Sequence, residues 1–560
     1  MKRTIILNGN SLTLEDVVAI ARGDSDHQGV RHYPHVELSP KAKQNLREFR
    51  AGLESRIAAG DVIYGVNTGC GAKKGTIIPT SEIDDYQAHY IPAHCVGFGN
   101  PFPEEVVRAA IVLRVNSFAL GNSGVRLEVC EKLLEIYNKG VIPVVPEQGS
   151  VGSSGDLCPL AHMVAVILGI SGQSALYRGS EVYDKDNVYD APEALKLAGI
   201  EPITLKAKEA MGLTNGSTFT LALGLLAVYD AERLMRYSHQ AAALSLEAIR
   251  GEKAAFDHRI HEARNNKGSI EVAATILALT ANSHRMTDSA RAIELKSEKK
   301  TKKYMDEEHK QATPRVQDAY SFRGYPQVAG PALKSLAYAY EVFVSEMNAA
   351  TDNPLIFKVE KEGEPVRFEA LSGGNFHGEP LAQAADILKL GLQGLANISD
   401  RRFYSMTMSS TSYGLPDDLA GPSKQDLNTG LMILQYTTAA LVSENKILCH
   451  PAVIDSIPTS ANQEDYVSMG TIAARYLRQV VKNAFGVIAA EFLAAAQGIS
   501  LTAEELQAGA HDGLGDQTAL IFRNIRKIIP PMLEDRYIHS DYKKVFEYLV
   551  EHDPEALLAK

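Results

Sequence analysis

Apolar residues recur with helical spacing over most of this chain. Several of the Ala- and Leu-rich stretches are apolar around most of their circumference, as expected for helices buried inside a bundle. Strand-like runs, such as TIIL, VIYGV and PVRFEAL, are short. The pattern therefore predicts a mainly α fold built on long helices. The stretches that predict long helices are 103–121, 217–249, 330–350, 379–403, 429–448 and 467–498.

One segment breaks this pattern. Residues 291–315 are charged and almost free of apolar spacing. We expect a solvated insertion there, with a mobile lid over a pocket as the alternative. A nucleic-acid or nuclear-localisation role is the weaker interpretation of its lysines, because acids are interleaved among them. No repeat with a period of about 20–50 residues is visible.

Composition narrows the class of protein. The 560 residues include 57 Lys plus Arg against 68 Asp plus Glu, a net charge of −11. This balance argues against nucleic acid or an anionic membrane as a partner. The N-terminus has only four consecutive apolar residues, and no apolar run approaches the ~20 residues of a membrane span. Five cysteines without a C-x-x-C pair indicate reduced thiols. We expect a cytoplasmic protein without a membrane or nucleic-acid partner and without a metal site.

A glycine- and serine-rich loop, EQGSVGSSGDLCPLAHM at 147–163, invites a chemical interpretation. A phosphate loop would need Lys and Ser/Thr after the last glycine, whereas Gly155 is followed by Asp156. A dinucleotide fingerprint would need a preceding strand, which Pro143 and Pro146 disrupt. A nucleophile elbow would need G-x-S-x-G, which is absent. These three interpretations fail.

A fourth interpretation uses the backbone of the loop. The amide nitrogen of Gly155 can attack the carbonyl carbon of Ser153, and loss of water closes a five-membered ring. A second dehydration converts Ser154 into an exocyclic methylidene, an electrophile made without an added cofactor. Such an attack needs an uncovered glycine nitrogen and a backbone held tightly. The alternative is a glycine-rich turn that caps a helix, with Asp156 near the helix start.

The loop GSVGSSGDLCPLAHM resembles the signature of the histidine, phenylalanine and tyrosine ammonia-lyases. In that family a 4-methylidene-imidazol-5-one group forms from an Ala-Ser-Gly triplet. Six further matches, in order along some 400 residues, make a chance resemblance very improbable. They are VIYGVNTGCG (62–71), MGLTNGS (211–217), VQDAYSFRGYPQV (316–328), ATDNPL (350–355), LSGGNFHGEP (371–380) and LVSENKILCHPAVIDSIPTSANQEDYVSMG (441–470).

One residue departs from the family pattern. Ser153 occupies the place of the triplet's Ala. That residue gives only its carbonyl carbon to the ring, so a CH₂OH substituent in place of CH₃ permits cyclisation. Ser154 and Gly155 are the residues that cannot change. The resemblance thus implies a cofactor formed from Ser153, Ser154 and Gly155, with no external cofactor.

Elimination of an α-amino group also needs a base for the β-proton. Tyr64 in VIYGVNTG matches the tyrosine that the family uses as this base, and Tyr320 in QDAYSFR matches its other catalytic tyrosine. A phenol with a pKa of ~10 must be perturbed to act near neutral pH, so we expect a buried and positively biased site.

The resemblance also implies a set of substrate-binding residues. Arg323 matches the position that holds the substrate carboxylate, a role suited to a planar guanidinium. Asn215 in TNGS, Gln317 in VQDAY and Phe376 in GGNFHG match other positions that contact the substrate or the ring.

Two further residues bear on which amino acid is the substrate. His94 and Glu464 match positions where the histidine enzymes carry His and Glu. The phenylalanine enzymes carry an apolar residue and Gln there. An imidazole and a carboxylate suit a polar ring with N–H donors and penalise a phenyl ring, because buried polar groups would stay unpaired. A histidine at position 94 can also meet a phenol hydroxyl.

These matches predict that the chain eliminates ammonia from an aromatic L-amino acid, most directly L-histidine to trans-urocanate. The alternatives are a tyrosine ammonia-lyase, an aminomutase, a lyase for a quaternary-amine histidine, and a non-catalytic helical scaffold. The family also implies a homotetramer with a long-helix bundle and a smaller mixed N-terminal part. We expect the domains to be 1–203 with the base tyrosine and the loop, 204–510 with the bundle, and 511–560 as a helical tail.

Overall fold

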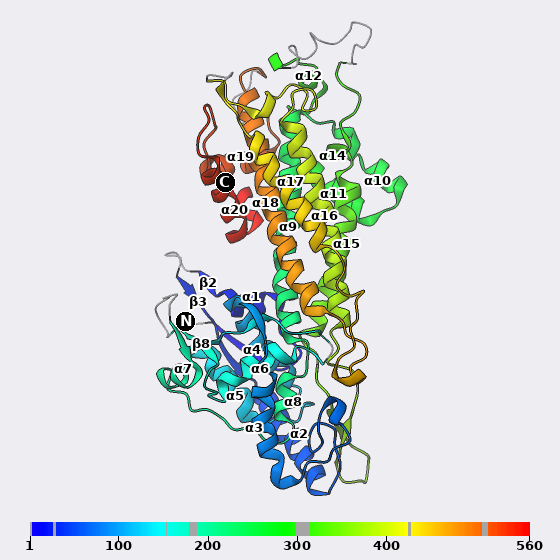
Figure 1. Cartoon of the computed structure of the whole chain (residues 1–560). Helices are drawn as coiled ribbons and strands as arrows, with labels where there is room; N and C mark the ends of the chain where they lie inside the picture. The colour runs from blue at the N-terminus through cyan, green and yellow to red at the C-terminus, as the bar shows by residue number, and fades with distance from the viewer. Residues whose placement is uncertain are drawn as a thin grey trace. The chain divides into compact units, whose positions relative to one another are not determined.

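The computed structural model describes residues 3–25, 30–152, 154–178, 187–297, 313–423, 427–506 and 513–560 (Figure 1). Ser153 and most of the charged segment 291–315 therefore lie outside the described residues, and the expectations for them stay predictions. The chain divides into two units, each built from three separate segments. Unit 1 comprises Met1–Tyr229, Ala339–Asp386 and Pro451–Arg478, and unit 2 comprises Asp230–Tyr338, Ile387–His450 and Gln479–Lys560. The three consecutive domains expected from the sequence stay a prediction.

Unit 1 combines short helices with small sheets. β1 pairs with β4 in parallel, β10 pairs with β11 antiparallel, and β6, β8 and β9 form a three-stranded antiparallel sheet. The helices that lie wholly in unit 1 are α1 (Leu14–Arg22), α2 (Pro40–Ala58), α3 (Ile83–His94), α4 (Glu104–Phe118), α5 (Leu127–Asn138), α6 (Leu157–Ile167), α7 (Ala191–Leu197) and α8 (Glu209–Thr214). The strands are β1 (Thr4–Leu7), β2 (Asp24–Ser25), β3 (Arg31–His32), β4 (His35–Leu38), β5 (Phe98–Pro101), β6 (Val141–Pro143), β7 (Pro146–Gln148), β8 (Ser174–Tyr177), β9 (Val188–Asp190), β10 (Leu355–Val359) and β11 (Arg367–Leu371).

The predicted long helices are present, with shifted ends. The predicted helix at 330–350 begins five residues earlier, because Pro331 lies inside the helix rather than at its start. The helices that contribute to both units are α9 (Thr218–Ile249), α15 (Tyr325–Glu346), α16 (Glu379–Met406) and α18 (Gly470–Thr502). Those within unit 2 are α10 (His258–Arg264), α11 (Lys267–Leu279), α12 (Asp288–Arg291), α14 (Tyr320–Arg323), α17 (Met432–Leu448), α19 (Asp516–Ile528) and α20 (Ile538–Glu551).

The strand-like run VIYGV forms a turn and not a strand. Gly65 takes a left-handed conformation with φ of 64°, which a β-strand does not contain. The amide of Val66 bonds the carbonyl of Ile63 at 3.1 Å and closes the turn. Along the chain, the turn with Tyr64 lies between α2 and the short 3₁₀ helix η1 (Gly71–Lys73).

Buried polar pairs join the helices of unit 2, where α16, α17 and α18 run lengthwise beside one another (Figure 1). Thr438 of α17 donates to Asp400 of α16 at 2.6 Å. Glu491 of α18 accepts hydrogen bonds from Arg402 at 2.5 and 2.8 Å and from Ser245 of α9 at 2.7 Å. Both Arg402 and Glu491 are buried, so this pair constrains how α16 packs against α18.

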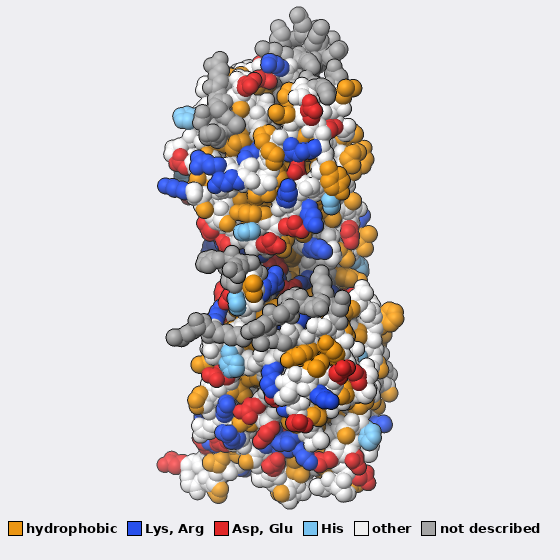
Figure 2. All heavy atoms as spheres, turned by 90° about the vertical axis from the view of Figure 1, so that its left-hand side faces the viewer, with side chains coloured by type: hydrophobic (Ala, Val, Ile, Leu, Met, Phe, Trp, Pro, Cys, Tyr) orange, Lys and Arg blue, Asp and Glu red, His pale blue; other side chains and the backbone are white. Residues whose placement is uncertain are grey.

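The expectation that no segment could span a membrane needs a correction for α18. This helix is long and apolar enough to do so by length and composition. Its most apolar window is, however, 89% buried inside the protein, which accounts for the composition. Basic and acidic side chains of the described residues lie among one another on the face shown in Figure 2.

The buried pair of Arg402 and Glu491 yields a stability prediction. Arg402→Leu leaves a buried carboxylate without its cation, so we expect it to lower the free energy of unfolding by about 3–5 kcal/mol. The double variant Arg402→Leu/Glu491→Leu removes both charges and should recover most of this loss. Urea-unfolding midpoints of the three proteins measure the effect. A single variant as stable as wild type would show that the pair contributes nothing.

Candidate active site

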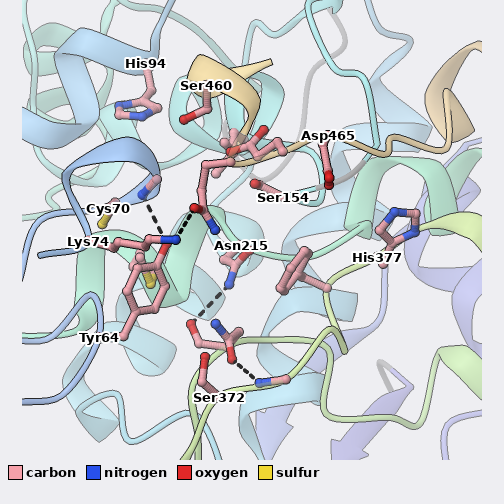
Figure 3. Close-up of a pocket in the computed structure, with 18 of the residues that line it drawn as sticks. Tyr64, Cys70, Lys74, His94, Ser154, Asn215, Ser372, His377, Ser460 and Asp465 are labelled. Carbon is pink, nitrogen blue, oxygen red and sulfur yellow. Dashed lines mark hydrogen bonds between the residues drawn. The ribbon is translucent and has the colours of Figure 1, made fainter. Parts of the chain in front are cut away.

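Unit 1 contains a cavity of about 800 Å³. Tyr64, His94, Ser154 and Asn215 are among the side chains that surround it in Figure 3. The structure thus brings together six residues singled out in the sequence, from segments up to 400 positions apart. The lining consists of Tyr64, Cys70, Gly71, Lys74, Tyr90, His94, Ser154, Leu157, Met211, Asn215, Asn353, Ser372, Gly373, Phe376, His377, Ser460, Gln463, Glu464, Asp465 and Tyr466.

Besides Gly155, which follows the lining residue Ser154, three of the described predicted site residues do not line this cavity. Gln317, Tyr320 and Arg323 belong to unit 2. Gln317 is exposed, and Tyr320 is 78% exposed. The guanidinium of Arg323 lies 4.6 Å from the centre of the Tyr320 ring, and its Nε donates to the carbonyl of Asp318 at 2.9 Å. Their roles stay predictions.

The glycine-serine loop is held by backbone contacts. Gly155 forms a parallel bridge with Gly216, and the amide of Asp156 donates to the carbonyl of Gly216 at 2.8 Å. Gly155 has a φ of 70°, and a Cβ added there would lie 2.1 Å from the nitrogen of Gly216. Every other residue type would push these two segments apart. Glycine at 155 is therefore required by the packing as well as by its backbone conformation.

Asp156 anchors the loop to two long helices. Its buried carboxylate accepts hydrogen bonds from the hydroxyls of Ser150 at 2.7 Å and Thr471 at 2.6 Å, and from the amide of Thr220 at 2.8 Å. Burial raises its pKa, while these donors act in the opposite direction. The helix-capping alternative is wrong in this respect: Asp156 precedes α6, but its side chain does not cap that helix.

Tyr64 is half-buried, and its hydroxyl accepts a hydrogen bond from the amide of Gly71 at 3.1 Å. Burial raises the pKa of Tyr64 above its ordinary value, and the charges of Cys70 and Glu464 raise it further. The expectation that the site biases this phenol toward ionisation is wrong for the single chain, because burial, together with the neighbouring Cys70 and Glu464, outweighs the hydrogen bond from the Gly71 amide that lowers the pKa of Tyr64.

His94 ends α3 and faces the cavity with a defined tautomer. Its ring stacks on Tyr90, with 4.0 Å between centroids and 16° between planes. Its Nδ1 lies 2.6 Å from the backbone carbonyl of Tyr90. Because a carbonyl oxygen only accepts, Nδ1 carries the hydrogen, and Nε2 of the neutral ring is an acceptor.

Glu464 supplies a second acceptor. Thr459 and Glu464 form an antiparallel bridge around the 3₁₀ helix η7 (Ser460–Asn462). The hydroxyl of Thr459 donates to Oε2 of Glu464 at 3.0 Å. None of the described residues donates to Oε1, which leaves this oxygen for a ligand. The cavity lining therefore includes two acceptors, suited to a ligand with N–H or O–H donors.

Asn215 and Phe376 lie on the remaining wall. Asn215 ends α8 and is buried. The hydroxyl of Ser217 donates to the backbone carbonyl of Phe376 at 2.9 Å and ties the GGNFHG segment to the start of α9. Phe376 itself adds an apolar ring to a lining that is otherwise rich in polar groups.

Sequence reasoning missed several lining residues that lie inside the motifs it used. Cys70, one residue before the glycine that bonds Tyr64, accepts from the hydroxyl of Tyr86 at 3.3 Å. Burial raises the pKa of this thiol. His377 follows Phe376, and its ring stacks on Tyr466 at 5.9 Å between centroids. Their position inside a matched motif was the available signal. Among the described residues, no group of three or more His, Cys, Asp or Glu could hold a metal ion.

The carboxylate of Glu464 should control the ionisation of Tyr64. Glu464→Gln removes a negative charge that disfavours the phenolate, so we expect the pKa of Tyr64 to fall below its wild-type value. The ultraviolet absorbance of tyrosinate, compared with that of the matching Tyr64→Phe protein, gives this pKa. Asp465→Asn is the control, because Asp465 lines the cavity but is not among the charges acting on Tyr64. An unchanged or higher pKa in Glu464→Gln would refute the coupling.

Comparisons with known proteins agree with this geometry. A model of the aromatic amino acid lyase family matches residues 12–527. A histidine ammonia-lyase from Caldanaerobacter subterraneus subsp. tengcongensis is 42% identical over 547 residues, which cover 98% of this chain and 96% of the relative. The crystal structure of histidine ammonia-lyase from Trypanosoma cruzi is similar with a TM-score of 0.82 and 35% identity, covering 99% of this chain and 95% of that one.

A phenylalanine aminomutase from Pantoea agglomerans is also similar, with a TM-score of 0.84 and 30% identity over 99% of this chain and all of that one. The fold is thus common to lyases and aminomutases. The family match covers most of the chain, and the long helices and the glycine-serine loop lie within it. The chain therefore belongs to the aromatic amino acid lyase family and is a carbon–nitrogen lyase.

Proposed function

We propose that this enzyme is a histidine ammonia-lyase that converts L-histidine to trans-urocanate and ammonia. The observation that carries the proposal is the presence of both His94 and Glu464 in the lining of the cavity that also holds Tyr64 and Ser154. Relatives at about 40% identity that are named histidine ammonia-lyases support it.

The two acceptors favour an imidazole over a phenyl ring. Nε2 of His94 and Oε1 of Glu464 can each accept a hydrogen bond from a ring N–H, so a protonated imidazole satisfies both. A phenyl ring would leave both acceptors desolvated and unpaired, which costs free energy. A tyrosine hydroxyl could donate to one of them, which keeps a tyrosine lyase or aminomutase as the second candidate.

The electrophile is proposed to be a methylidene-imidazolone formed from Ser153, Ser154 and Gly155. The described residues fit this group: Ser154 lines the cavity, and Gly155 is pressed against Gly216 without room for a side chain. Such a group supplies an electrophile that makes the substrate's amine a good leaving group. The compressed backbone supports cyclisation, because it reduces the conformational freedom that ring closure must overcome.

Tyr64 is the proposed base for the β-proton. Its hydroxyl faces the cavity, and the Gly71 amide holds it in place and would stabilise the phenolate. Within the single chain the pKa of Tyr64 is raised, so a further cation close to the phenol would favour its ionisation near neutral pH. Phe376 and Asn215 complete the wall around the substrate.

We propose that this cation is the Arg323 of a second subunit in a cytoplasmic homotetramer. Gln317, Tyr320 and Arg323 do not line the cavity of their own chain. The exposure of Gln317 and Tyr320 supports their delivery to a neighbouring subunit. There Arg323 would hold the substrate carboxylate through its planar guanidinium, and Tyr320 would lie near the reacting atoms.

The electrophile can be tested by intact-protein mass. We expect wild-type protein to weigh two water molecules less than its sequence, and Ser154→Ala to regain one or both. Tyr64→Phe is the matched control, because it should keep the mass loss while losing most of the turnover. An active wild-type enzyme at full sequence mass would overturn the electrophile and favour a quaternary-amine substrate, whose amine leaves unaided.

Substrate choice can be tested at Glu464. Glu464→Gln loses a charged hydrogen bond of roughly 1.5–3 kcal/mol, so kcat/KM for histidine should fall about 10- to 150-fold. Adding His94→Leu should shift preference toward phenylalanine, because both acceptors are then weakened or lost. Urocanate, coumarate and cinnamate absorbance measures the three activities. A wild-type preference for tyrosine, or a histidine rate indifferent to Glu464, would contradict the assignment.

A further inference from the structure

A fully buried ion pair lies directly behind Asn215. The ammonium of Lys208 donates to Oδ2 of Asp352 at 2.7 Å, and neither side chain is exposed to solvent. Lys208 also approaches the carbonyl of Asn353 at 3.3 Å. Asn353 lines the cavity, whereas Lys208 and Asp352 do not. The pair is therefore one layer removed from the substrate.

The pair determines which way the amide of Asn215 points. Nδ2 of Asn215 donates to Oδ1 of Asp352 at 3.3 Å and to the carbonyl of Asn353 at 3.1 Å. None of the described residues donates to Oδ1 of Asn215. The side chain thus presents an acceptor to a ligand, which suits the N–H groups of an amine and not a carboxylate.

A second buried cation fixes the backbone at the same point. Arg114 donates to the carbonyls of Asn215 at 2.8 Å and of Thr351 at 3.0 Å. A Cβ added to Gly216 would lie 2.3 Å from Nη1 of Arg114. The backbone of Asn215 is therefore held by Arg114, and its side-chain amide is held by Asp352.

We propose that Asp352 and Lys208 are positioning residues that hold Asn215 with its side-chain oxygen toward the amino group of the substrate. Oδ1 of Asp352 accepts from the amide of Asn215, and Lys208 neutralises the carboxylate so that it can stay buried. This arrangement rests on the proposed ammonia-lyase function and assigns two residues outside the cavity to it.

The alternative role is purely structural, since a buried ion pair always affects folding. The two roles differ in what happens when Asn215 is absent. If Asp352 acts through Asn215, its loss matters only while Asn215 is present, and the two substitutions are coupled. If Asp352 serves folding alone, any loss of activity caused by its substitution is the same whether or not Asn215 is present, and the fold-losses of the two substitutions multiply.

The test is a double-mutant cycle with histidine as substrate. The four proteins are wild type, Asp352→Asn, Asn215→Ala and the double variant. We expect Asp352→Asn to lower kcat/KM about tenfold or more in the wild-type background and less than about twofold in the Asn215→Ala background. Equal fold-losses in both backgrounds would overturn the proposal.

Asp352→Asn strands the buried charge of Lys208 and so endangers folding. The variant Lys208→Met/Asp352→Leu carries neither charge and no acceptor for the amide of Asn215, and we expect it to fold with the same loss and the same coupling to Asn215. Wild-type kcat/KM in this variant would also overturn the proposal. Melting temperatures of all variants report folding separately from turnover.

Glu105→Gln is the matched control. Glu105 lies in the same unit, pairs with Arg22 and Arg478, and does not line the cavity. We expect it to lower the melting temperature and leave kcat/KM unchanged. If wild type fails to turn over histidine, the proposed function fails, and the same cycle is run on the amino acid that wild type accepts.

Discussion

The approach of Gly155 to Gly216 is the contact on which the rest of the site depends. Two glycine backbones meet where any side chain would collide, and the buried Asp156 beside them is bonded to Thr220 and Thr471. The loop therefore cannot relax away from the first turns of α9 and α18. Ser154 lies next to this contact. The packing of Gly155 against Gly216 therefore also sets the position of Ser154 in the cavity lining.

Around this loop, the cavity lining presents several hydrogen-bond acceptors. His94 and Glu464 each offer one acceptor to a ligand. The other ring nitrogen of His94 already bonds the carbonyl of Tyr90, and the other carboxylate oxygen of Glu464 already bonds the hydroxyl of Thr459. Asn215 offers a third acceptor, oriented by Asp352. Such orientation in advance of binding is what lets a polar site discriminate, because a ligand that cannot donate leaves these groups unpaired.

The charge of the single chain around Tyr64 is opposite to what a phenolate base requires. Burial and the neighbouring Glu464 both raise its pKa, and the guanidinium of Arg323 is not part of this cavity. In the proposed mechanism, the carboxylate of Glu464 that would accept from the substrate ring also disfavours ionisation of Tyr64, and a further cation would offset this effect. This conflict gives a physical reason for the proposed assembly of the active site from more than one subunit.

The sequence by itself determined the helical class, the long helices and the family, because helical periodicity and the order of the motifs can be recognised in the amino-acid sequence alone. It also selected six cavity residues. It could not show that VIYGV forms a turn, since the left-handed Gly65 overrides the apolar pattern. Only the tertiary structure decided that Asp156 bonds Thr220 and Thr471 instead of capping α6, and that Lys208 and Asp352 support Asn215. These contacts join residues far apart in the chain, so no local pattern encodes them.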